Sequence, residues 1–277
     1  MNHAFTVDLE DWYQGIPVDG ARKASAERRL HIGTERLLEL LQASGARATF
    51  FALSVIAKEH PAILRQIAAA GHEIGSHGES HDLVYEMGPQ RFREETRASI
   101  RDLEDCVGQP VKSYRAAYFS ITERSMWALD ILTSEGVRVD SSIFPVKNWR
   151  YGIPHYSRRP LLVDTPSGPL CEFPISTRQF LGRNVPTTGG AYFRLYPYRL
   201  TSSNIRASER EGMPVVFYLH PWELDPKQPV VRFRRRAMLT HYARLGSTQP
   251  KLSRLLAEFR FTTLSNVLAE AFPQLAV

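Results

Sequence analysis

The sequence contains little cysteine, with only Cys106 and Cys171 among 277 residues. Two thiols cannot build a disulfide framework, and without a second pair they cannot form a cysteine-based zinc site. We interpret both as reduced, partly buried thiols. Long hydrophobic runs are also missing, because no stretch approaches the roughly 20 apolar residues that a membrane span needs. The sequence therefore predicts a globular protein without a membrane-spanning segment.

A targeting pattern at the N-terminus is missing as well. Residues 1–4 lead directly into a strand-like run, and neither the basic region nor the apolar region of a signal peptide precedes it. On this basis we expect a cytoplasmic location. The sequence indicates no particular oligomeric state.

Positive charge is in moderate excess, since 35 lysines and arginines against 29 aspartates and glutamates give a net charge of +6. Part of this excess lies in one late segment that contains Arg232, Arg234, Arg235, Arg236 and Arg244. Such a cluster is typical of a nucleic-acid or anionic-glycan surface, or of a solvated basic helix. We favour the solvated helix and expect no nucleic-acid partner, because no recognised nucleic-acid motif accompanies these arginines.

Strand and helix patterns alternate along most of the chain. The predicted strands are 4–9, 48–53, 73–77, 113–116, 137–140, 214–220 and 261–264. The predicted helices are 31–44, 61–70, 89–107, 123–134 and 251–260, and the proline- and glycine-rich residues 144–199 are predicted as loops and short strands. This alternation predicts an α/β fold with a parallel sheet covered by helices in one domain. The chemically reactive residues follow strands, where α/β barrels place their active sites.

The strongest local signal is the pair His77 and His81 in the run His-Gly-Glu-Ser-His. Two imidazoles four residues apart can face one ion if the backbone forms a helical turn there. The alternative is a pair of solvated loop histidines. Because the pair follows a predicted strand, we favour a metal site.

An acidic cluster, Asp8-Leu9-Glu10-Asp11, ends the first predicted strand. Three neighbouring carboxylates repel one another unless a cation is close. On a strand Asp8 and Glu10 point the same way, and one carboxylate with two histidines makes a three-ligand metal site that leaves room for water. The alternative is an acidic loop that caps the next element.

Two further residues follow predicted strands. His220 comes after a strongly apolar strand and is a candidate acid or base, with a hydrogen-bonded core histidine as the alternative. Arg115 is either a surface residue or a buried arginine, which would need a carboxylate partner such as Asp8.

These segments, in this order, resemble the carbohydrate esterase family 4, the NodB-homology polysaccharide deacetylases. The four matching motifs are 5–10, 71–81, 114–118 and 217–221. Residues 139–145, 151–154 and 220–226 further resemble the subgroup associated with bacterial exopolysaccharide and exosortase gene clusters. The likeness covers nearly the whole chain.

The resemblance implies a distorted (β/α)7 barrel in one domain over residues 1–277, with 221–277 as a subgroup-specific C-terminal extension packed on it. It also implies that an N-acetyl group is hydrolysed from an N-acetylated glycan and released as acetate. A divalent metal ion would be the cofactor, with Zn²⁺ expected and Co²⁺ or another ion as the alternative.

Carried over position by position, the resemblance assigns roles to individual residues. His77 and His81 would bind the metal, Asp8 would be the general base and His220 the general acid. Other residues would support them, with Arg115 orienting Asp8, Asp140 tuning His220, and a backbone N–H near Tyr118 binding the oxyanion.

Two departures from the family pattern affect these roles. Many members have two adjacent aspartates in the first motif, whereas Leu9 follows Asp8 here. By the spacing of other branches Glu10 is the carboxylate ligand, and a bulged strand end could present Asp11 instead. The third motif usually has proline where this chain has Ala117.

Two other functions remain open on the same scaffold. One is hydrolysis of a small cyclic amide such as allantoin, and the other is glycan binding without catalysis. Intact Asp8, His77, His81 and His220 argue against the pseudoenzyme, whereas Ala117 argues for it. Five aromatic residues could stack on sugars or pack in the core: Trp12, Tyr13, Trp149, Tyr151 and Trp222.

Overall fold

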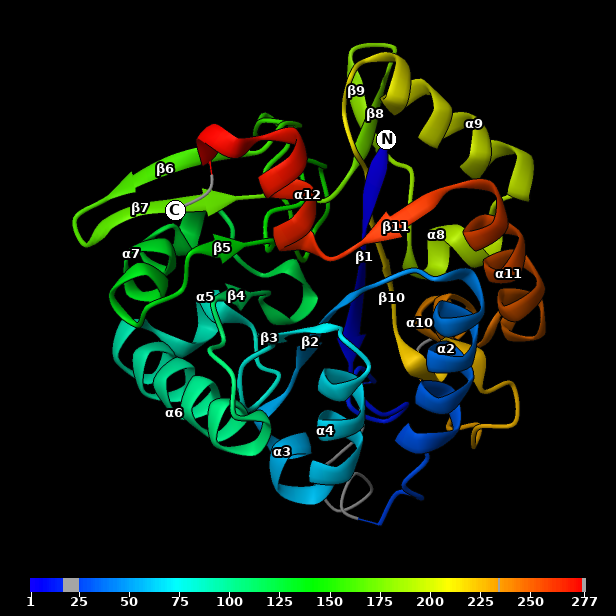
Figure 1. Cartoon of the computed structure of the whole chain (residues 1–277), viewed down its shortest axis with the longest axis horizontal. Helices are drawn as coiled ribbons and strands as arrows, with labels where there is room; N and C mark the ends of the chain where they lie inside the picture. The colour runs from blue at the N-terminus through cyan, green and yellow to red at the C-terminus, as the bar shows by residue number, and fades with distance from the viewer. Residues whose placement is uncertain (17–24, 234, 276–277) are drawn as a thin grey trace.

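A computed structural model describes residues 1–16, 25–233 and 235–275, and a mainly parallel sheet lies at its centre (Figure 1). The strands are β1 (Asn2–Leu9), β2 (Thr49–Ala52), β3 (Glu73–Ser76), β4 (Ser113–Tyr114), β5 (Val139–Asp140), β6 (Leu161–Thr165), β7 (Gly168–Glu172), β8 (Thr177–Phe180), β9 (Arg183–Pro186), β10 (Val216–Leu219) and β11 (Arg260–Thr262).

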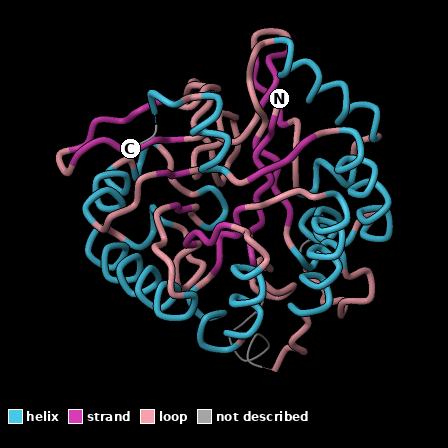
Figure 2. Tube along the Cα trace, viewed as in Figure 1, coloured by secondary structure: helices cyan, strands magenta, loops and turns pink. Residues whose placement is uncertain are grey.

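Helices surround these strands (Figure 2). The α-helices are α2 (Leu30–Ser44), α3 (Ser54–Glu59), α4 (Pro61–Ala69), α5 (Val84–Met87), α6 (Pro89–Val107), α7 (Trp127–Ser134), α8 (Gly190–Leu195), α9 (Tyr198–Arg210), α10 (Arg235–Tyr242), α11 (Thr248–Glu258) and α12 (Leu264–Ala271). Short 3-10 helices include η1 (Ala117–Phe119) and η3 (Pro221–Leu224). No helix in the described part of the chain is long and apolar enough to cross a membrane.

The sheet contains seven neighbouring parallel strands in the order β10-β1-β2-β3-β4-β5-β7. β6 adds antiparallel to β7, and β11 pairs parallel with the start of β1. This architecture confirms the predicted α/β fold and is consistent with a distorted seven-stranded barrel. Because all seven strands point the same way, their carboxyl ends lie at one edge.

The barrel has a seam between β7 and β10. Within the described residues, no backbone ladder joins these two strands. Side chains bridge the gap instead: Ser176 Oγ accepts a hydrogen bond from Val216 N at 2.7 Å, and Thr188 Oγ1 donates to Val216 O at 2.8 Å. The β8–β9 hairpin lies in the connection that crosses this seam.

Helix α6 illustrates why the predicted helices form. Pro89 fits its first turn, and Gly108 adopts the left-handed conformation that ends it. Phe92, Ile100 and Leu103 are buried on one face of the helix. The structure therefore confirms the predicted range 89–107.

Differences from the prediction concentrate in the middle of the chain. Residues 144–199 were expected as loops and short strands, but α8 and the start of α9 lie there. β7 is an interior parallel strand beside β5 rather than an isolated short strand. In the predicted basic cluster, Arg234 lies outside the described residues, and α10 begins directly after it.

Candidate active site

The carboxyl ends of the strands bring together residues that are far apart in sequence. Glu10 follows β1, His77 follows β3, and His220 follows β10. Glu10 and His77 are buried together with Asp8, the residue before the last of β1, and the partly buried His220 lies against Glu10 and Asp8. Arg115 enters from the end of β4 and is fully buried.

Glu10, His77 and His81 form a candidate metal site. One ligand atom from each lies within 4.8 Å of the others. Glu10 Oε2 is 2.8 Å from His81 Nε2, yet Glu10 Oε2 is buried without a hydrogen-bond partner. A buried carboxylate oxygen that close to an imidazole nitrogen, with no bond to satisfy it, fits a shared cation. One carboxylate and two imidazoles suit Zn²⁺ and related divalent ions.

Hydrogen bonding prepares His77 for this role. His77 Nδ1 lies 2.8 Å from the backbone oxygen of Arg115, so Nδ1 carries the proton and Nε2 is left as the ligand atom. Burial lowers the pKa of His77 to about 4, so the ring is neutral near pH 7. A neutral imidazole is the form that binds a metal.

The backbone between the two histidines differs from the predicted helical turn. Residues 77–83 form bends and irregular structure, and both Gly78 and His81 have positive φ angles of 83° and 59°. These left-handed residues reverse the chain after β3 and bring the two rings to a centroid distance of 5.3 Å. The histidines therefore meet through a tight loop.

Asp8 lies beside this cluster and is held by Arg115. Arg115 Nη1 donates to Asp8 Oδ1 and to Thr6 Oγ1, both at 2.8 Å, while its Nε and Nη2 bond to Ser141. The guanidinium also lies 4.3 Å from the ring centre of Phe51. With Oδ1 fixed in this way, Asp8 Oδ2 faces His220 Nε2 at 3.8 Å.

Asp11 is turned away from the cluster and caps α2. Its carboxylate accepts hydrogen bonds from the backbone N–H groups of Trp12, Arg29 and Leu30 at 2.8–3.1 Å. These bonds satisfy free donors at the start of the helix. Of the two carboxylates considered for the metal, Glu10 is therefore the one placed with the histidines.

His220 is held by a buried acid that the sequence analysis did not identify. Its Nδ1 lies 2.9 Å from Glu223 Oε1, and its backbone N–H donates to the same oxygen at 3.0 Å. Glu223 Oε2 accepts from Arg194 Nε at 2.6 Å. Arg194 is fully buried and also donates to the backbone oxygens of residues 240, 241 and 243.

These contacts control the charge of His220. Burial alone would lower its pKa, but the hydrogen bond to Glu223 and the carboxylates of Glu10 and Asp8 raise the pKa to about 9. Burial would raise the pKa of Glu223, but Arg194 and His220 lower it to about 2. The pair is therefore an imidazolium and a carboxylate at neutral pH.

Close packing fixes the segment that carries Glu223. A Cβ atom on Gly33 of α2 would lie 2.0 Å from the backbone oxygen of Pro221, so only glycine allows η3 to approach this closely. Arg36 of the same helix donates to Leu224 O at 2.7 Å. Helix α2 thereby positions the turn that begins at His220.

The resemblance implied that Asp140 tunes His220, but the contacts of Asp140 in the structure are with Ser142 and Glu172. Asp140 Oδ1 accepts from Ser142 Oγ at 2.5 Å, and its register partner on β7 is Glu172. Burial and the Asp140 carboxylate raise the pKa of Glu172 well above its usual range. Glu223 is the acid that the structure places against His220.

Tyr118 lies over the candidate metal site. The centre of its ring is 4.5 Å from the centre of the His81 ring. The guanidinium of Arg150, from the loop after β5, lies 3.8 Å from the centre of the Tyr118 ring. Burial raises the pKa of Tyr118 to about 12. Tyr118 has left-handed φ and ψ angles of 56° and 19°. Among the described residues, none accepts a hydrogen bond from its backbone N–H.

Comparison with known proteins adds two sequence matches and several relatives. Residues 30–137 match the polysaccharide deacetylase family, and residues 141–269 match a domain of unknown function, DUF3473. A peptidoglycan-N-acetylglucosamine deacetylase from Bacillus cereus is 28% identical over 39% of this chain and 44% of its own length. A chitooligosaccharide deacetylase from Azorhizobium caulinodans is 28% identical over 42% of this chain and 54% of its own. The chain thus spans about half the length of these curated relatives.

Solved structures share the fold. A candidate polysaccharide deacetylase from Mycobacterium smegmatis superposes with a TM-score of 0.67 at 21% identity, over 98% of this chain and 90% of that chain. The Puue allantoinase superposes with a TM-score of 0.62 at 17% identity, over 98% and 90% respectively. At these identities the likeness shows that the scaffold is of the type found in the polysaccharide deacetylases and in this allantoinase.

Proposed function

We propose that this chain, which the match of residues 30–137 supports as a member of the polysaccharide deacetylase family, is a metal-dependent N-deacetylase of an amino-sugar-containing glycan. The observation that carries the proposal is the Glu10–His77–His81 cluster with Asp8 and His220 at its edge. The two curated relatives described above act, by their names, on acetylated amino-sugar polymers or oligomers. We infer Zn²⁺ as the ion, because this ligand set suits it.

A divalent ion held by Glu10, His77 and His81 would supply a Lewis acid that polarises the acetamide carbonyl and acidifies water. Asp8 Oδ2, which faces the cluster, accepts the proton of the attacking water. Arg115 orients Asp8 through the bond to Oδ1. The protein thereby places a base next to the attacking oxygen before substrate arrives.

Two other groups complete the reaction. The backbone N–H of Tyr118, free of internal partners in the described part of the chain, donates to the developing oxyanion. His220 Nε2 gives its proton to the leaving amine, while Glu223 stabilises the charged ring from Nδ1. Acetate and a free amino sugar are the products.

We propose further that the glycan belongs to an exopolysaccharide or is an intermediate in its formation. Support comes from the subgroup motifs at 139–145, 151–154 and 220–226. The motifs 151–154 and 220–226 lie within residues 141–269, and the motif 139–145 overlaps the start of this region. Residues 141–269 match the domain of unknown function rather than the deacetylase family.

Acetate release from a panel of substrates tests the proposed function. The metal-loaded full chain should release acetate from N-acetylglucosamine oligomers or from acetylated exopolysaccharide fragments, and a chelator should stop the release. Hydrolysis of allantoin without acetate release would favour the cyclic-amide alternative. Glycan binding without any turnover by metal-replete protein would identify a pseudoenzyme and contradict the proposal.

Glu223→Gln should lower kcat by about 10- to 100-fold with little change in KM. The amide keeps the shape of the side chain but removes the negative charge that stabilises the His220 imidazolium. Acetate release at neutral pH measures the effect, and metal content should stay constant.

Glu135→Gln is a matched control, because Glu135 at the end of α7 pairs with Arg93 and Arg97 of α6, away from the candidate active site. Melting curves check that each variant folds, since Glu223→Gln also leaves Arg194 without its charged partner. Glu223→Asp retains the charge and should retain more activity than Glu223→Gln. A Glu223→Gln protein that is stable and fully active would disprove the role of Glu223.

A further inference from the structure

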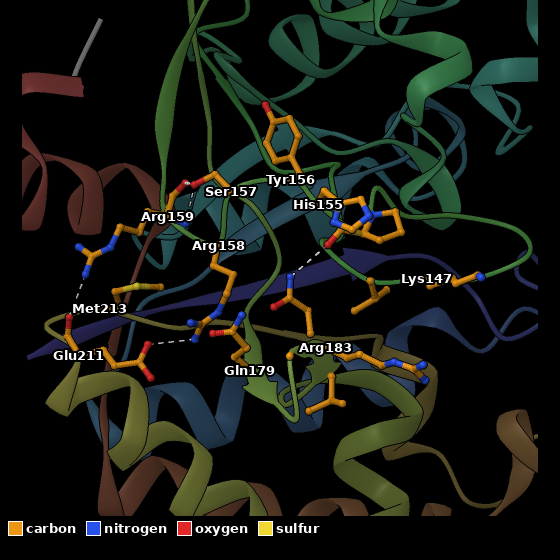
Figure 3. Close-up of a pocket in the computed structure, with 15 residues that line it drawn as sticks. Lys147, His155, Tyr156, Ser157, Arg158, Arg159, Gln179, Arg183, Glu211 and Met213 are labelled. Carbon is orange, nitrogen blue, oxygen red and sulfur yellow. Dashed lines mark hydrogen bonds and ion pairs between the residues drawn. The ribbon is translucent and has the colours of Figure 1, made fainter.

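A cleft that is separate from the candidate active site lies between residues 146–159 and the β8–β9 hairpin (Figure 3). The cleft encloses about 1210 Å³, which is ample for a ligand larger than a single sugar. None of the residues proposed above for metal binding or catalysis lines it. Its charged lining residues are Lys147, Arg158, Arg159, Arg183 and Glu211.

Positive charge in this cleft is largely uncompensated. Arg158 Nη2 lies 3.0 Å from Glu211 Oε2 and so uses the single carboxylate of the lining. Within the described residues, the Arg159 guanidinium bonds only to the backbone oxygen of Glu211, at 3.2 Å. Among the residues that the structure describes, no carboxylate pairs with the exposed side chains of Lys147 or Arg183. Such a cleft attracts an anion.

The two unpaired cations come from different walls of the cleft. Lys147 belongs to the loop after β5, whereas Arg183 begins β9. Figure 3 shows both side chains with their charged ends toward the same side of the cleft. A ligand that enters from this side meets two cations from separate parts of the chain, which is a geometry that can select for a charged group.

The loop that carries Lys147 also leads to the candidate active site. Three residues further along, Arg150 covers the ring of Tyr118, which in turn packs on His81. Three residues span at most about 11 Å. Trp149 lies between these points and is 88% exposed, so its ring is free to stack on a sugar. One extended ligand can therefore contact the cleft, Trp149 and the site above His81.

We propose that the cleft binds an anionic group carried by the glycan substrate, either the carboxylate of a uronic acid or a phosphate. The inference rests on the proposed deacetylase function and adds a charge requirement to it. The acetylated sugar occupies the Glu10–His77–His81 cluster, Trp149 supports a neighbouring sugar, and Lys147 and Arg183 bind the anion. The protein would then prefer an acidic glycan to a neutral one of the same length.

Calorimetric titration of the metal-loaded full chain tests this proposal. The Asp8→Asn form prevents turnover during the titration. The probes are an oligosaccharide of alternating glucuronate and N-acetylglucosamine, a neutral N-acetylglucosamine oligomer of equal length, and UDP-N-acetylglucosamine, whose pyrophosphate represents the phosphate source. The test variant is Lys147→Gln with Arg183→Gln. The control is Lys112→Gln, which removes an exposed lysine before β4 that does not line the cleft.

The double variant should weaken binding of at least one anionic probe by 10-fold or more, while the affinity for the neutral oligomer and the effect of Lys112→Gln stay within twofold. Added salt should weaken the same interaction in the unmutated cleft. A weakened uronate probe identifies a carboxylate, and weakened UDP-sugar binding identifies a phosphate. Equal affinity of the double variant and the parent for both anionic probes would overturn the proposal. Acetate release is measured separately, so a failure of the deacetylase function would be recognised as such.

Discussion

Asp8→Asn is expected to reduce acetate release by at least about 100-fold while leaving bound metal near its normal content. Asparagine has nearly the same shape and can still accept a hydrogen bond from Arg115 Nη1. It cannot accept a proton from water at neutral pH, so the base is lost but the neighbouring ligands remain. Steady-state acetate release and elemental analysis of the same preparation measure the two effects.

Asp11→Asn provides the matched control, because Asp11 lies three residues away but caps α2 instead of facing the cluster. We expect it to cost about 1–2 kcal/mol of stability, because the amide NH2 cannot accept the backbone N–H bonds that one carboxylate oxygen accepts, and to leave kcat unchanged. Retained turnover in Asp8→Asn would refute the assignment of the base.

His77→Ala is expected to lose both the bound metal and the activity. Alanine removes one of three ligands and also the hydrogen bond to Arg115 O that orients the ring. Elemental analysis after dialysis should show the stoichiometry falling from about one ion per chain toward zero, and acetate release should fall with it.

His31→Ala serves as the control, since His31 is exposed on α2. It should keep its metal and its activity. A His77→Ala protein that remains folded and retains its full metal content would show that the ion binds elsewhere or that His77 is not a ligand.

Much of the fold could be predicted from local patterns. Helix α6 has its apolar residues at helical spacing between a proline and a glycine, so both its type and its ends are encoded locally. β7 was not distinguished from the short strands around it, because its sequence begins Gly168-Pro169 and offers little apolar pattern. It becomes an interior strand only through pairing with β5.

In the candidate site, too, some contacts could be predicted from local sequence and others depend on distant segments. Strand ends predicted that Asp8, His77, His81 and His220 would meet, because parallel strands bring their carboxyl ends together. Glu223 was missed, although it lies three residues after His220 and closes a capping box around η3, a spacing that could have indicated the contact. Neither local spacing nor composition could place Arg194 behind Glu223, since that contact joins distant segments.

The seam between β7 and β10 separates the candidate active site from the β8–β9 wall of the cleft. Asp8 and the residues proposed for metal binding and catalysis lie on or directly after strands that are joined by continuous ladders. The β8–β9 hairpin instead belongs to the connection across the seam, where the hydroxyls of Ser176 and Thr188 bond to Val216. Insertions or deletions in that hairpin would alter the walls of the basic cleft without disturbing the strands that hold Asp8 and the histidines. Changes in the hairpin could therefore alter which ligand the cleft binds without altering the geometry of the Glu10–His77–His81 cluster.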